Sequence, residues 1–343
     1  MMSTVAANRP SGRLPEMNWI RGFAALMIML YHYTSLYSDF FSTQWLVKID
    51  RGWGAVSTFY VLSGFLTVCS LKNSERVLNY VWKRIKRLYP AYWVCIVLTA
   101  VSMYFFLPSR SKDIRTIAIN FTMLQWVFGV ADVDAAYWTM QFELKFYAFI
   151  AILLLIRQQK NIKWYTLLWV LVSFVFYSLF NLRGITRRLV RLPAIWLMVE
   201  NCAPFASGVF LACIHKKRRD ISAWVCLLFS LALCLYTQSD GHIIGHFCAV
   251  IAIGASVMLR SSLSLKDRYM AVVNRLDRGV LRPLAWFASI SYPFYLLHKF
   301  IGWAVLQGIE SVGFHGQWII VFPFAVCTLL AWLVHHFVEQ KVR

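Results

Sequence analysis

The sequence predicts an all-α protein, a polytopic transmembrane helical bundle of about ten spans with both termini in the cytoplasm. Three observations lead to this fold class. Of the 343 residues, 59% are hydrophobic and only 15% are charged, whereas soluble domains carry about a quarter charged residues. Apolar runs of about 20 residues, long enough to cross a bilayer, recur along the whole chain. The 35 Lys and Arg residues cluster in short loops between those runs, as the positive-inside rule expects.

The apolar runs define the spans in order. Each run ends where charged residues begin, for example at Lys72 after the second run and at Arg260 after the eighth. The third run begins with Tyr89-Pro90. A proline at this point is compatible with a helix start, because proline is tolerated in the first turn of a helix. The predicted spans lie near 19–37, 52–71, 88–107, 138–156, 164–182, 195–214, 222–238, 242–259, 284–306 and 318–338.

The charge distribution sets the predicted orientation. Residues 1–17 would form a cytoplasmic tail, and residues 18–340 would form a single membrane domain with no appended soluble domain. The inner loops 72–87, 215–221 and 260–283 would then hold most of the basic residues. The longest of them, 260–283, has room for one amphipathic helix and nothing larger.

Two segments leave the topology open. Residues 114–131 are less apolar than the spans and could be re-entrant, interfacial or an eleventh span, although the charge distribution favours a segment that does not cross. The loop LRGITRRLVRLP, 182–193, falls on the outer side with four arginines. Either this loop meets an anionic substrate, or the span count is wrong at that point.

Several kinds of site are disfavoured. The net charge of +20 could indicate nucleic acid, but the loop positions of the basic residues argue against it. The eight cysteines lie mostly in apolar runs without a CxxC pair, which is typical of small buried side chains. His242 and His246, at i and i+4, are a possible ligand pair, and His335-His336 add further imidazoles. No carboxylate or third ligand is evident near the pair, so we expect no metal.

Two ionisable residues lie inside the first apolar run. Arg21 and His32 interrupt the stretch NWIRGFAALMIMLYHYTSLY. Their spacing of eleven residues is about three helical turns, so both side chains lie on one helix face, roughly 16 Å apart along the axis. Because an ionisable group inside a spanning helix is costly, the pair indicates a functional site.

Later spans place further ionisable residues at the depth of His32. In the predicted topology Glu143 and His298 both fall in the outer half of the bundle. Ser291 and Tyr292 lie deeper in the span that carries His298. One shared polar cavity would satisfy all three ionisable groups, and an imidazole beside a carboxylate is suited to proton transfer. The alternative is that each polar side chain only joins helices by hydrogen bonds.

A basic cluster precedes the third span. The sequence KRIKR places Lys83, Arg84 and Arg87 within five residues. Arg84 and Arg87 are at i and i+3, so they share a face if the stretch is helical. The cluster could serve only to set the topology and to contact anionic lipid. It could also clamp a phosphorylated donor, because arginine binds phosphate through paired hydrogen bonds.

These stretches together resemble the acyltransferase 3 family of membrane O-acyltransferases, which modify bacterial surface carbohydrates. No single motif is specific, but seven occur in the family's order and cover nearly the whole chain. They are RGFAALMIMLYH at 21–32, FYVLSGF at 59–65, RIKRLYP at 84–90, YWTMQFELKFY at 137–147, FASGVFL at 205–211, ISYPFYLLH at 290–298 and HHFVEQKVR at 335–343.

The resemblance implies roles for particular residues. His32 would be the essential catalytic residue and Arg21 its partner on the donor side. Arg84 and Arg87 correspond to the family's Arg-x-x-Arg motif, and Glu143 corresponds to its Trp-Thr/Ser…Glu motif. We expect His32 to act as a general base or to carry the acetyl group transiently, with Glu143 orienting its ring. The residues expected to bind donor or acceptor are Lys83, Arg84, Arg87, Ser291, Tyr292 and His298.

The expected activity is the transfer of an acetyl group from cytoplasmic acetyl-coenzyme A to a hydroxyl of a cell-surface polysaccharide or its lipid-linked precursor. The expected location is the bacterial inner membrane, in contact with lipid and with polysaccharide-biosynthesis machinery. The alternative is a carrier or flippase for a lipid-linked sugar or small anion, since transporters also bury ionisable residues near mid-membrane. No paired broken helices or inverted repeat support that alternative.

Overall fold

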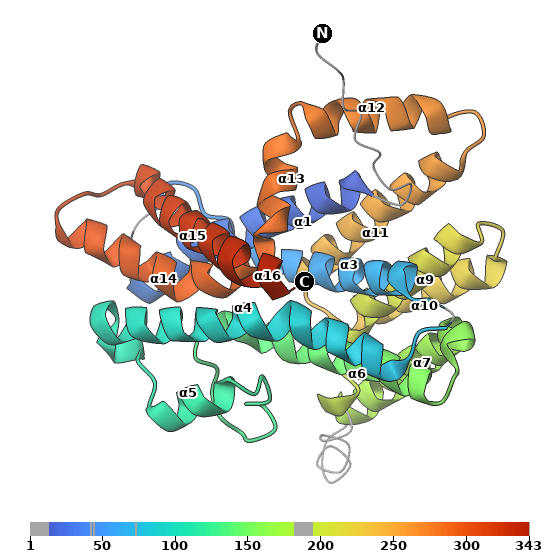
Figure 1. Ribbon diagram of the computed structural model, residues 1–343, viewed down its shortest axis with the longest axis horizontal. Coiled ribbons are helices and arrows are strands. Elements are labelled where there is room, and N and C mark those ends of the chain that lie inside the picture. Colours follow the sequence, from blue (N-terminus) through green and yellow to red (C-terminus); the bar gives the residue numbers. More distant parts are fainter. Residues whose placement is uncertain (1–13, 42, 44, 73, 182–194, 343) are drawn as a thin grey trace.

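The computed structural model describes residues 14–41, 43, 45–72, 74–181 and 195–342. Within these ranges the chain folds into helices joined by turns and contains no strand, so the predicted all-α class is confirmed. The N-terminal residues 1–13 and the basic loop 182–193 lie outside the described residues. Figure 1 shows α12 (Lys266–Arg278) at one edge of the molecule and α5 (Ile114–Asn120), next to α4, at the opposite edge.

Six helical segments in the described part of the chain are long and apolar enough to cross a membrane. They contain the helices α3 (Ala55–Ser70), α4 (Val77–Phe106), α6 (Met140–Leu155), α7 (Ile162–Asn181), α11 (Asp240–Ser261) and α15 (Val321–Val334). Two further apolar helices are shorter, α9 (Cys202–Lys216) and α10 (Ile221–Thr237). The length and apolar composition of these helices are those of an integral membrane protein.

The first predicted span is a helix whose winding changes at His32. Helix α1 (Pro15–Tyr31) begins with proline in its first turn, where the missing N–H is not needed. It continues as a π-helical segment, η1 (His32–Leu36), and then as α2 (Tyr37–Phe41). Short π-helical segments inside longer helices occur frequently at functional sites, and this one starts at His32.

The predicted span 284–306 is two helices, so the prediction of one continuous helix was wrong. Helix α13 (Arg282–Ser289) ends and α14 (Ser291–Ser311) begins on either side of Ile290. Pro293 explains the break, because a proline ring in a continuous helix would clash with the carbonyl four residues earlier, that of Ser289. Helix α14 is almost fully buried by its neighbours, so it tolerates polar residues that lipid would not.

Two other predicted elements differ in length. Residues 114–131 contain only α5, whose seven residues extend about 10 Å, far less than the hydrocarbon core of a bilayer. The predicted span 195–214 is helical from Cys202 onward, and the residues before it form turns in which Met198 has a positive φ of 53°. Neither segment forms an additional long helix.

Close packing of α3 against α9 forms the centre of the bundle. Gly64 and Gly208 face each other across this contact: a Cβ atom on Gly64 would lie 2.2 Å from the carbonyl oxygen of Phe205, and one on Gly208 would lie 2.1 Å from that of Val61. Small residues at such a contact let two helix backbones approach closely. The glycines of FYVLSGF and FASGVFL therefore have a structural role.

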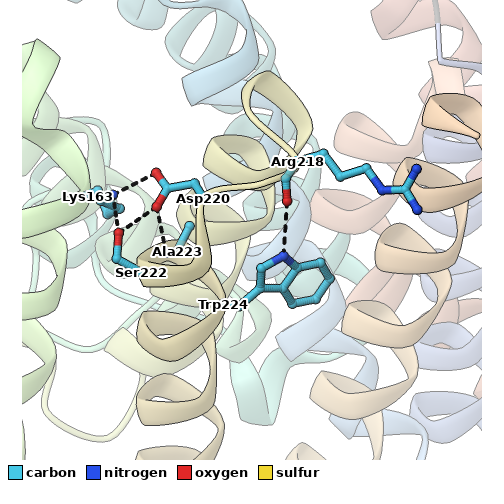
Figure 2. Close-up of polar contacts among 6 residues, drawn as sticks. All are labelled: Lys163, Arg218, Asp220, Ser222, Ala223 and Trp224. Atoms are coloured by element: carbon cyan, nitrogen blue, oxygen red, sulfur yellow. Dashed lines mark hydrogen bonds and ion pairs between the residues drawn. The ribbon is translucent and has the colours of Figure 1, made fainter.

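The loop between α9 and α10 is held by an acidic cap. Figure 2 shows Asp220 accepting hydrogen bonds from Lys163 on α7, at 2.7 Å, from Ser222, and from the backbone N–H of Ala223. This is a helix N-cap reinforced by an ion pair. The hydrogen bonds from Lys163 and Ser222 lower the pKa of Asp220 from 3.8 to about 2.

A second polar cluster attaches the amphipathic helix α12 to the start of α1. Arg260, at the end of α11, donates two hydrogen bonds to the Glu16 carboxylate, at 2.9 and 2.6 Å, and Tyr269 on α12 donates a third at 2.7 Å. Burial raises the pKa of Glu16, but the hydrogen bonds from Arg260 and Tyr269 outweigh it, so the pKa lies below its ordinary value. The loop 260–283 is thereby fixed to the bundle.

Candidate active site

A polar cavity of about 290 Å³, the inner cavity, lies between α1, α3, α4, α6 and the break between α13 and α14. Four charged residues line it: Arg21, Arg87, Glu143 and Glu339. Ser291 and Tyr292, at the start of α14, also line it. The interrupted helix thus presents its polar first turn to a cavity, which is where irregular backbone is tolerated at membrane depth.

A second cavity of about 500 Å³, the vestibule, shares three lining residues with the inner cavity: Arg21, Ala288 and Ser289. Its other lining residues come from the beginning of α1, the end of α3 and α13, among them Asn18 and Ser70. In the predicted topology these are the cytoplasmic ends of the helices. The two cavities therefore adjoin at Arg21, Ala288 and Ser289.

Glu143 faces the inner cavity and is held by neutral donors. Tyr147, one turn further along α6, donates a hydrogen bond to Glu143, and Ser63 on α3 lies 3.4 Å from the same oxygen. Arg87 interacts electrostatically with both Glu143 and Tyr147. The carboxylate is thus hydrogen-bonded to two hydroxyls and interacts electrostatically with an arginine.

The three basic residues predicted to act together have separate environments. Arg87 lines the inner cavity. Arg84 lies between the rings of Tyr80 and Tyr147, 4.9 and 4.7 Å from their centroids, and contacts the cavity cluster only through Tyr147. Lys83 points outward and pairs with Glu75 at 2.8 Å, its side chain 64% exposed. Lys83 and Arg87 thus have different surroundings and do not face a common ligand.

His32 and His298 form a buried pair. Nδ1 of His32 lies 2.6 Å from Nε2 of His298, and the two rings are stacked with centroids 4.8 Å apart. Nδ1 of His298 lies 2.7 Å from the carbonyl oxygen of Tyr295. A carbonyl oxygen can only accept, so Nδ1 of His298 carries the proton and, in the neutral ring, Nε2 is the acceptor.

The same chain of hydrogen bonds sets the tautomer of His32. Because Nε2 of neutral His298 must accept, Nδ1 of His32 donates to it, and the lone pair of neutral His32 is on Nε2. His32 is 9% exposed and His298 is 1% exposed. The basic nitrogen therefore belongs to the more accessible ring of the pair.

Further hydrogen bonds fix the backbone that carries both rings. Trp303 donates from Nε1 to the carbonyl oxygen of His32 at 2.9 Å, and the hydroxyl of Tyr33 donates to that of His298 at 2.8 Å. Gly302 makes room for Tyr33, since a Cβ atom there would lie 2.3 Å from its hydroxyl oxygen. Such outer contacts hold a reactive group in one orientation.

The structure divides the group of residues that the sequence predicted to share one cavity. Arg21, Arg87, Glu143, Ser291 and Tyr292 line the inner cavity, and neither histidine of the pair is among its described lining residues. Glu143 makes its hydrogen bonds with Tyr147 and Ser63, and the ring partner of His32 is His298. The described contacts therefore do not show Glu143 orienting the ring of His32, which is the role that the sequence led us to expect.

Tyr295 connects the two parts. It lines the inner cavity, and its ring centroid lies 5.5 Å from that of His298. Its hydroxyl is 3.0 Å from the carbonyl oxygen of Ala136, to which it donates, and 2.9 Å from the hydroxyl of Thr139, another residue of the cavity. Tyr295 therefore contacts both the histidine pair and the cavity that contains Arg87.

Glu339 is a cavity residue that our sequence reasoning did not single out. It ends the second π-helical segment, η7 (His335–Glu339), and is 3% exposed. His335 contacts its carboxylate, and Arg87 interacts with it electrostatically. A carboxylate after a long apolar run, in HHFVEQKVR, is the signal that could have found it.

The other histidines considered as ligands have structural partners. Ser57 lies 2.9 Å from Nδ1 of His242, and Ser207 lies 2.8 Å from Nε2 of His246. Among the described residues, no three His, Cys, Asp or Glu side chains lie close enough together to hold a metal ion. Both serines lie on neighbouring helices, so the contacts join α11 to α3 and α9.

Comparison with known proteins decides the family. The model of an acyltransferase domain, acyltransferase 3, matches residues 14–336. The chain belongs to the acyltransferase 3 family. The resemblance drawn from the seven motifs is thereby confirmed, and acyl transfer is the chemistry for which this site must account.

Two curated proteins resemble parts of this acyltransferase. A putative acetyltransferase of Acidianus two-tailed virus is 29% identical over 140 residues, which cover 40% of each chain. The peptidoglycan O-acetyltransferase OatA of Listeria monocytogenes is 27% identical over 153 residues, 39% of this chain and 23% of OatA. The matches therefore span less than half of either relative. No solved structure matches the chain.

Proposed function

We propose that this protein is an integral membrane O-acetyltransferase that transfers an acetyl group from acetyl-coenzyme A to a hydroxyl of a cell-surface polysaccharide or its lipid-linked precursor. Family membership supports acyl transfer, and one relative is a peptidoglycan O-acetyltransferase by name. The observation that carries the proposal is the chain from the Tyr295 carbonyl through His298 to His32, which leaves a basic nitrogen on His32.

The chain of hydrogen bonds suits a general base. The acceptor's hydroxyl oxygen attacks the carbonyl carbon of the thioester, and its proton passes to Nε2 of His32. The carbon–sulfur bond breaks, and the leaving coenzyme thiolate takes up that proton. While His32 is protonated, Nε2 of His298 still accepts from Nδ1, so the neutral partner stabilises the imidazolium.

The same geometry allows covalent catalysis. Nε2 of His32 would attack the carbonyl carbon of the thioester, the carbon–sulfur bond would break and the coenzyme would leave as its thiolate. In a second step the acceptor's hydroxyl oxygen would take the acetyl group, the carbon–nitrogen bond would break, and the hydroxyl proton would neutralise the thiolate. Both routes require the lone pair at Nε2, and therefore both depend on His298. Ser291 and Tyr292 line the cavity and donate to the carbonyl oxygens of Ala288 and Leu88, so their hydroxyl oxygens would accept a hydrogen bond from the acceptor's hydroxyl.

The topology and location complete the proposal. The protein would cross the bacterial inner membrane about ten times with both termini in the cytoplasm, so that the vestibule opens to the cytoplasmic coenzyme. It would act beside the machinery that makes the polysaccharide. The exposed apolar side chains along the long helices, such as Trp93, Phe174 and Leu228, would contact lipid.

The test uses purified full-length protein in lipid vesicles with acetyl-labelled acetyl-coenzyme A and a surface polysaccharide fraction. We expect release of free coenzyme together with a mass gain of one acetyl group per modified sugar, and we expect His32→Ala to abolish both while still inserting. Movement of a substrate across the vesicle without consumption of acetyl-coenzyme A would instead establish the carrier.

A further inference from the structure

Another cavity of about 240 Å³, the side cavity, lies on the opposite face of α6 from the inner cavity. Helix α6 contributes Gln141 and Lys145 to the side cavity, whereas Met140 and Glu143 line the inner cavity. The other wall of the side cavity includes residues from the turns 197–201 that precede α9. Irregular backbone at membrane depth is tolerated where it lines a cavity, so these turns are compatible with a binding site.

Lys145 is a buried cation without a carboxylate partner. It is 8% exposed, and its Nζ donates to the side-chain oxygen of Gln141 at 3.3 Å and to the carbonyl oxygen of Ile195 at 3.0 Å. Nζ also lies 4.0 Å from the centroid of the Trp126 ring. All 15 Asp and Glu residues of the chain lie in the described ranges, and none forms an ion pair with Lys145. The described contacts of this charge are therefore all with neutral groups.

Two other lysines of the bundle face a carboxylate. Lys163 pairs with Asp220 at 2.7 Å, and Lys299, which is 7% exposed, interacts electrostatically with Asp134. A buried charge is costly unless it is paired, and an ionisable residue inside a membrane protein indicates a functional site. The missing counter-charge at Lys145, beside a cavity, therefore points to a ligand that brings a negative charge.

The side chain of Lys145 extends towards the start of α6. Gln141, which accepts one of its hydrogen bonds, lies one turn earlier, and helical side chains lean towards the N-terminus of their helix. In the predicted topology that end of α6 faces outward. Trp126 makes an edge contact with Trp196, which is 57% exposed, and tryptophans are enriched at the level of lipid headgroups. The charge thus lies where the phosphate of an outer-leaflet lipid would be.

We propose that the side cavity binds the phosphodiester headgroup of a membrane lipid, with a phosphate oxygen accepting the third N–H of Lys145. A phosphodiester carries one negative charge, which matches one ammonium group. Glu200 also lines the cavity, and its exposed carboxylate would oppose a second negative charge. The acyl chains would lie along the exposed side chains of Ile195 and Trp196. This inference does not depend on acetyl transfer.

The experiment measures lipid retention by purified full-length protein in an uncharged detergent, by native mass spectrometry. The probes are phosphatidylglycerol, a phosphodiester with one negative charge, and diacylglycerol with the same acyl chains and no phosphate. We expect the protein to retain phosphatidylglycerol in preference to diacylglycerol. Lys145→Met should weaken the tightest phosphatidylglycerol binding by at least about tenfold, because a charge-assisted hydrogen bond is lost. Lys145→Arg keeps the charge and should keep most of the affinity.

Two variants at exposed positions complete the comparison. Glu200→Gln should strengthen phosphatidylglycerol binding by about twofold, since repulsion between charges separated by solvent is weak. This substitution changes no buried side chain, so it tests the site even where Lys145→Met fails to fold. Lys160→Met, in η5 (Gln159–Asn161), removes a lysine outside the cavity and should leave lipid binding unchanged.

Three results would overturn the inference. The first is equal retention of phosphatidylglycerol and diacylglycerol. The second is unchanged phosphatidylglycerol binding in folded Lys145→Met or in Glu200→Gln. The third is displacement of bound phosphatidylglycerol at lower concentration by a soluble acidic saccharide, trigalacturonate, or by a polyprenyl diphosphate, which would assign the cavity to a different anion. Failure of the proposed function has a separate signature, namely a wild-type protein that does not consume acetyl-coenzyme A.

Discussion

Two buried histidine contacts in this protein differ from each other: the contact of His32 with His298, and the contact of His246 with Ser207. His32 contacts His298, whose other nitrogen donates to a carbonyl, so the direction of each hydrogen bond is determined. His246 contacts the hydroxyl of Ser207, which also bonds to Ser230. Because the hydroxyl of Ser230 donates to the carbonyl oxygen of Leu227, Ser207 donates to Ser230 and accepts from Nε2 of His246, so the lone pair of neutral His246 is on Nδ1.

The two sites also differ in access. His246 is fully buried, at 0% exposure, and its Nδ1 makes no hydrogen bond within the described structure. His32 is 9% exposed and begins a π-helical segment. Neither burial nor a fixed tautomer therefore separates the two histidines. They differ in exposure, since Nδ1 of His246 is enclosed in the bundle whereas His32 keeps a small exposed area.

The largest expected difference is between replacing His32 and replacing His246. His32→Ala should lower kcat by at least about 10³-fold, since the base is removed. His246→Ala should leave the kcat of the folded protein unchanged and lower its free energy of unfolding by about 1–3 kcal/mol, because a buried hydrogen bond is lost. Acetyl transfer and thermal unfolding in detergent measure the two effects, and equal losses of kcat would remove the distinction.

The next prediction concerns the partner that sets the tautomer. His298→Ala should lower kcat by about 10²-fold while changing the KM for the donor little, because Nδ1 of His32 loses its acceptor. His298→Gln, whose amide oxygen can accept from Nδ1, should recover part of the rate. A Glu143→Gln variant as slow as His298→Ala, with unchanged KM, would restore Glu143 as the orienting group.

A smaller contrast comes from deleting one hydroxyl near His298 and, separately, one hydroxyl near His242. Tyr33→Phe removes the donor to the His298 carbonyl, and should lower kcat by no more than about tenfold, since a buried neutral hydrogen bond contributes about 1 kcal/mol. Ser57→Ala removes the partner of His242 and should leave kcat unchanged. Rates are compared per mole of folded protein, and a rate loss in Ser57→Ala would contradict its structural role.

The smallest effect should occur outside both histidine sites, at the cap of α10. Asp220 has a pKa of about 2 in the folded protein and 3.8 ordinarily, so its contribution to stability is present above pH 4 and lost as the pH falls towards 2. Asp220→Asn should remove that pH dependence and lower the unfolding free energy by about 1 kcal/mol. Asp240→Asn, at an exposed site in α11, is the matched control in thermal unfolding at several pH values.

Much of the fold could be predicted because long apolar runs leave little choice of structure. In lipid each backbone polar group needs an internal partner, so a long apolar run becomes a helix. The exceptions were local. Pro293 interrupts the run at 284–306, and no pattern of residues indicated the π-helical segments that begin at His32 and His335.

The candidate site was predicted as a set of residues rather than as an arrangement. The cost of burying charge in a membrane singled out Arg21, His32, Glu143 and His298, and the order of seven motifs identified the family. Depth along a helix could be estimated from sequence, but the direction of each side chain around the bundle could not. That is why Glu143 was paired with His32, and why Glu339, near the end of the chain, was missed.

The sequence alone determined that the protein is helical and that it belongs in a membrane, since both follow from composition and periodicity. It also indicated an acyltransferase, through the resemblance of seven ordered motifs to a known family. The tertiary structure decided which groups face one another. It joined His32 to His298 and brought Arg87, Glu143 and Glu339 to one cavity. Those contacts depend on how helices far apart in the chain rotate and pack, and no local pattern records that rotation.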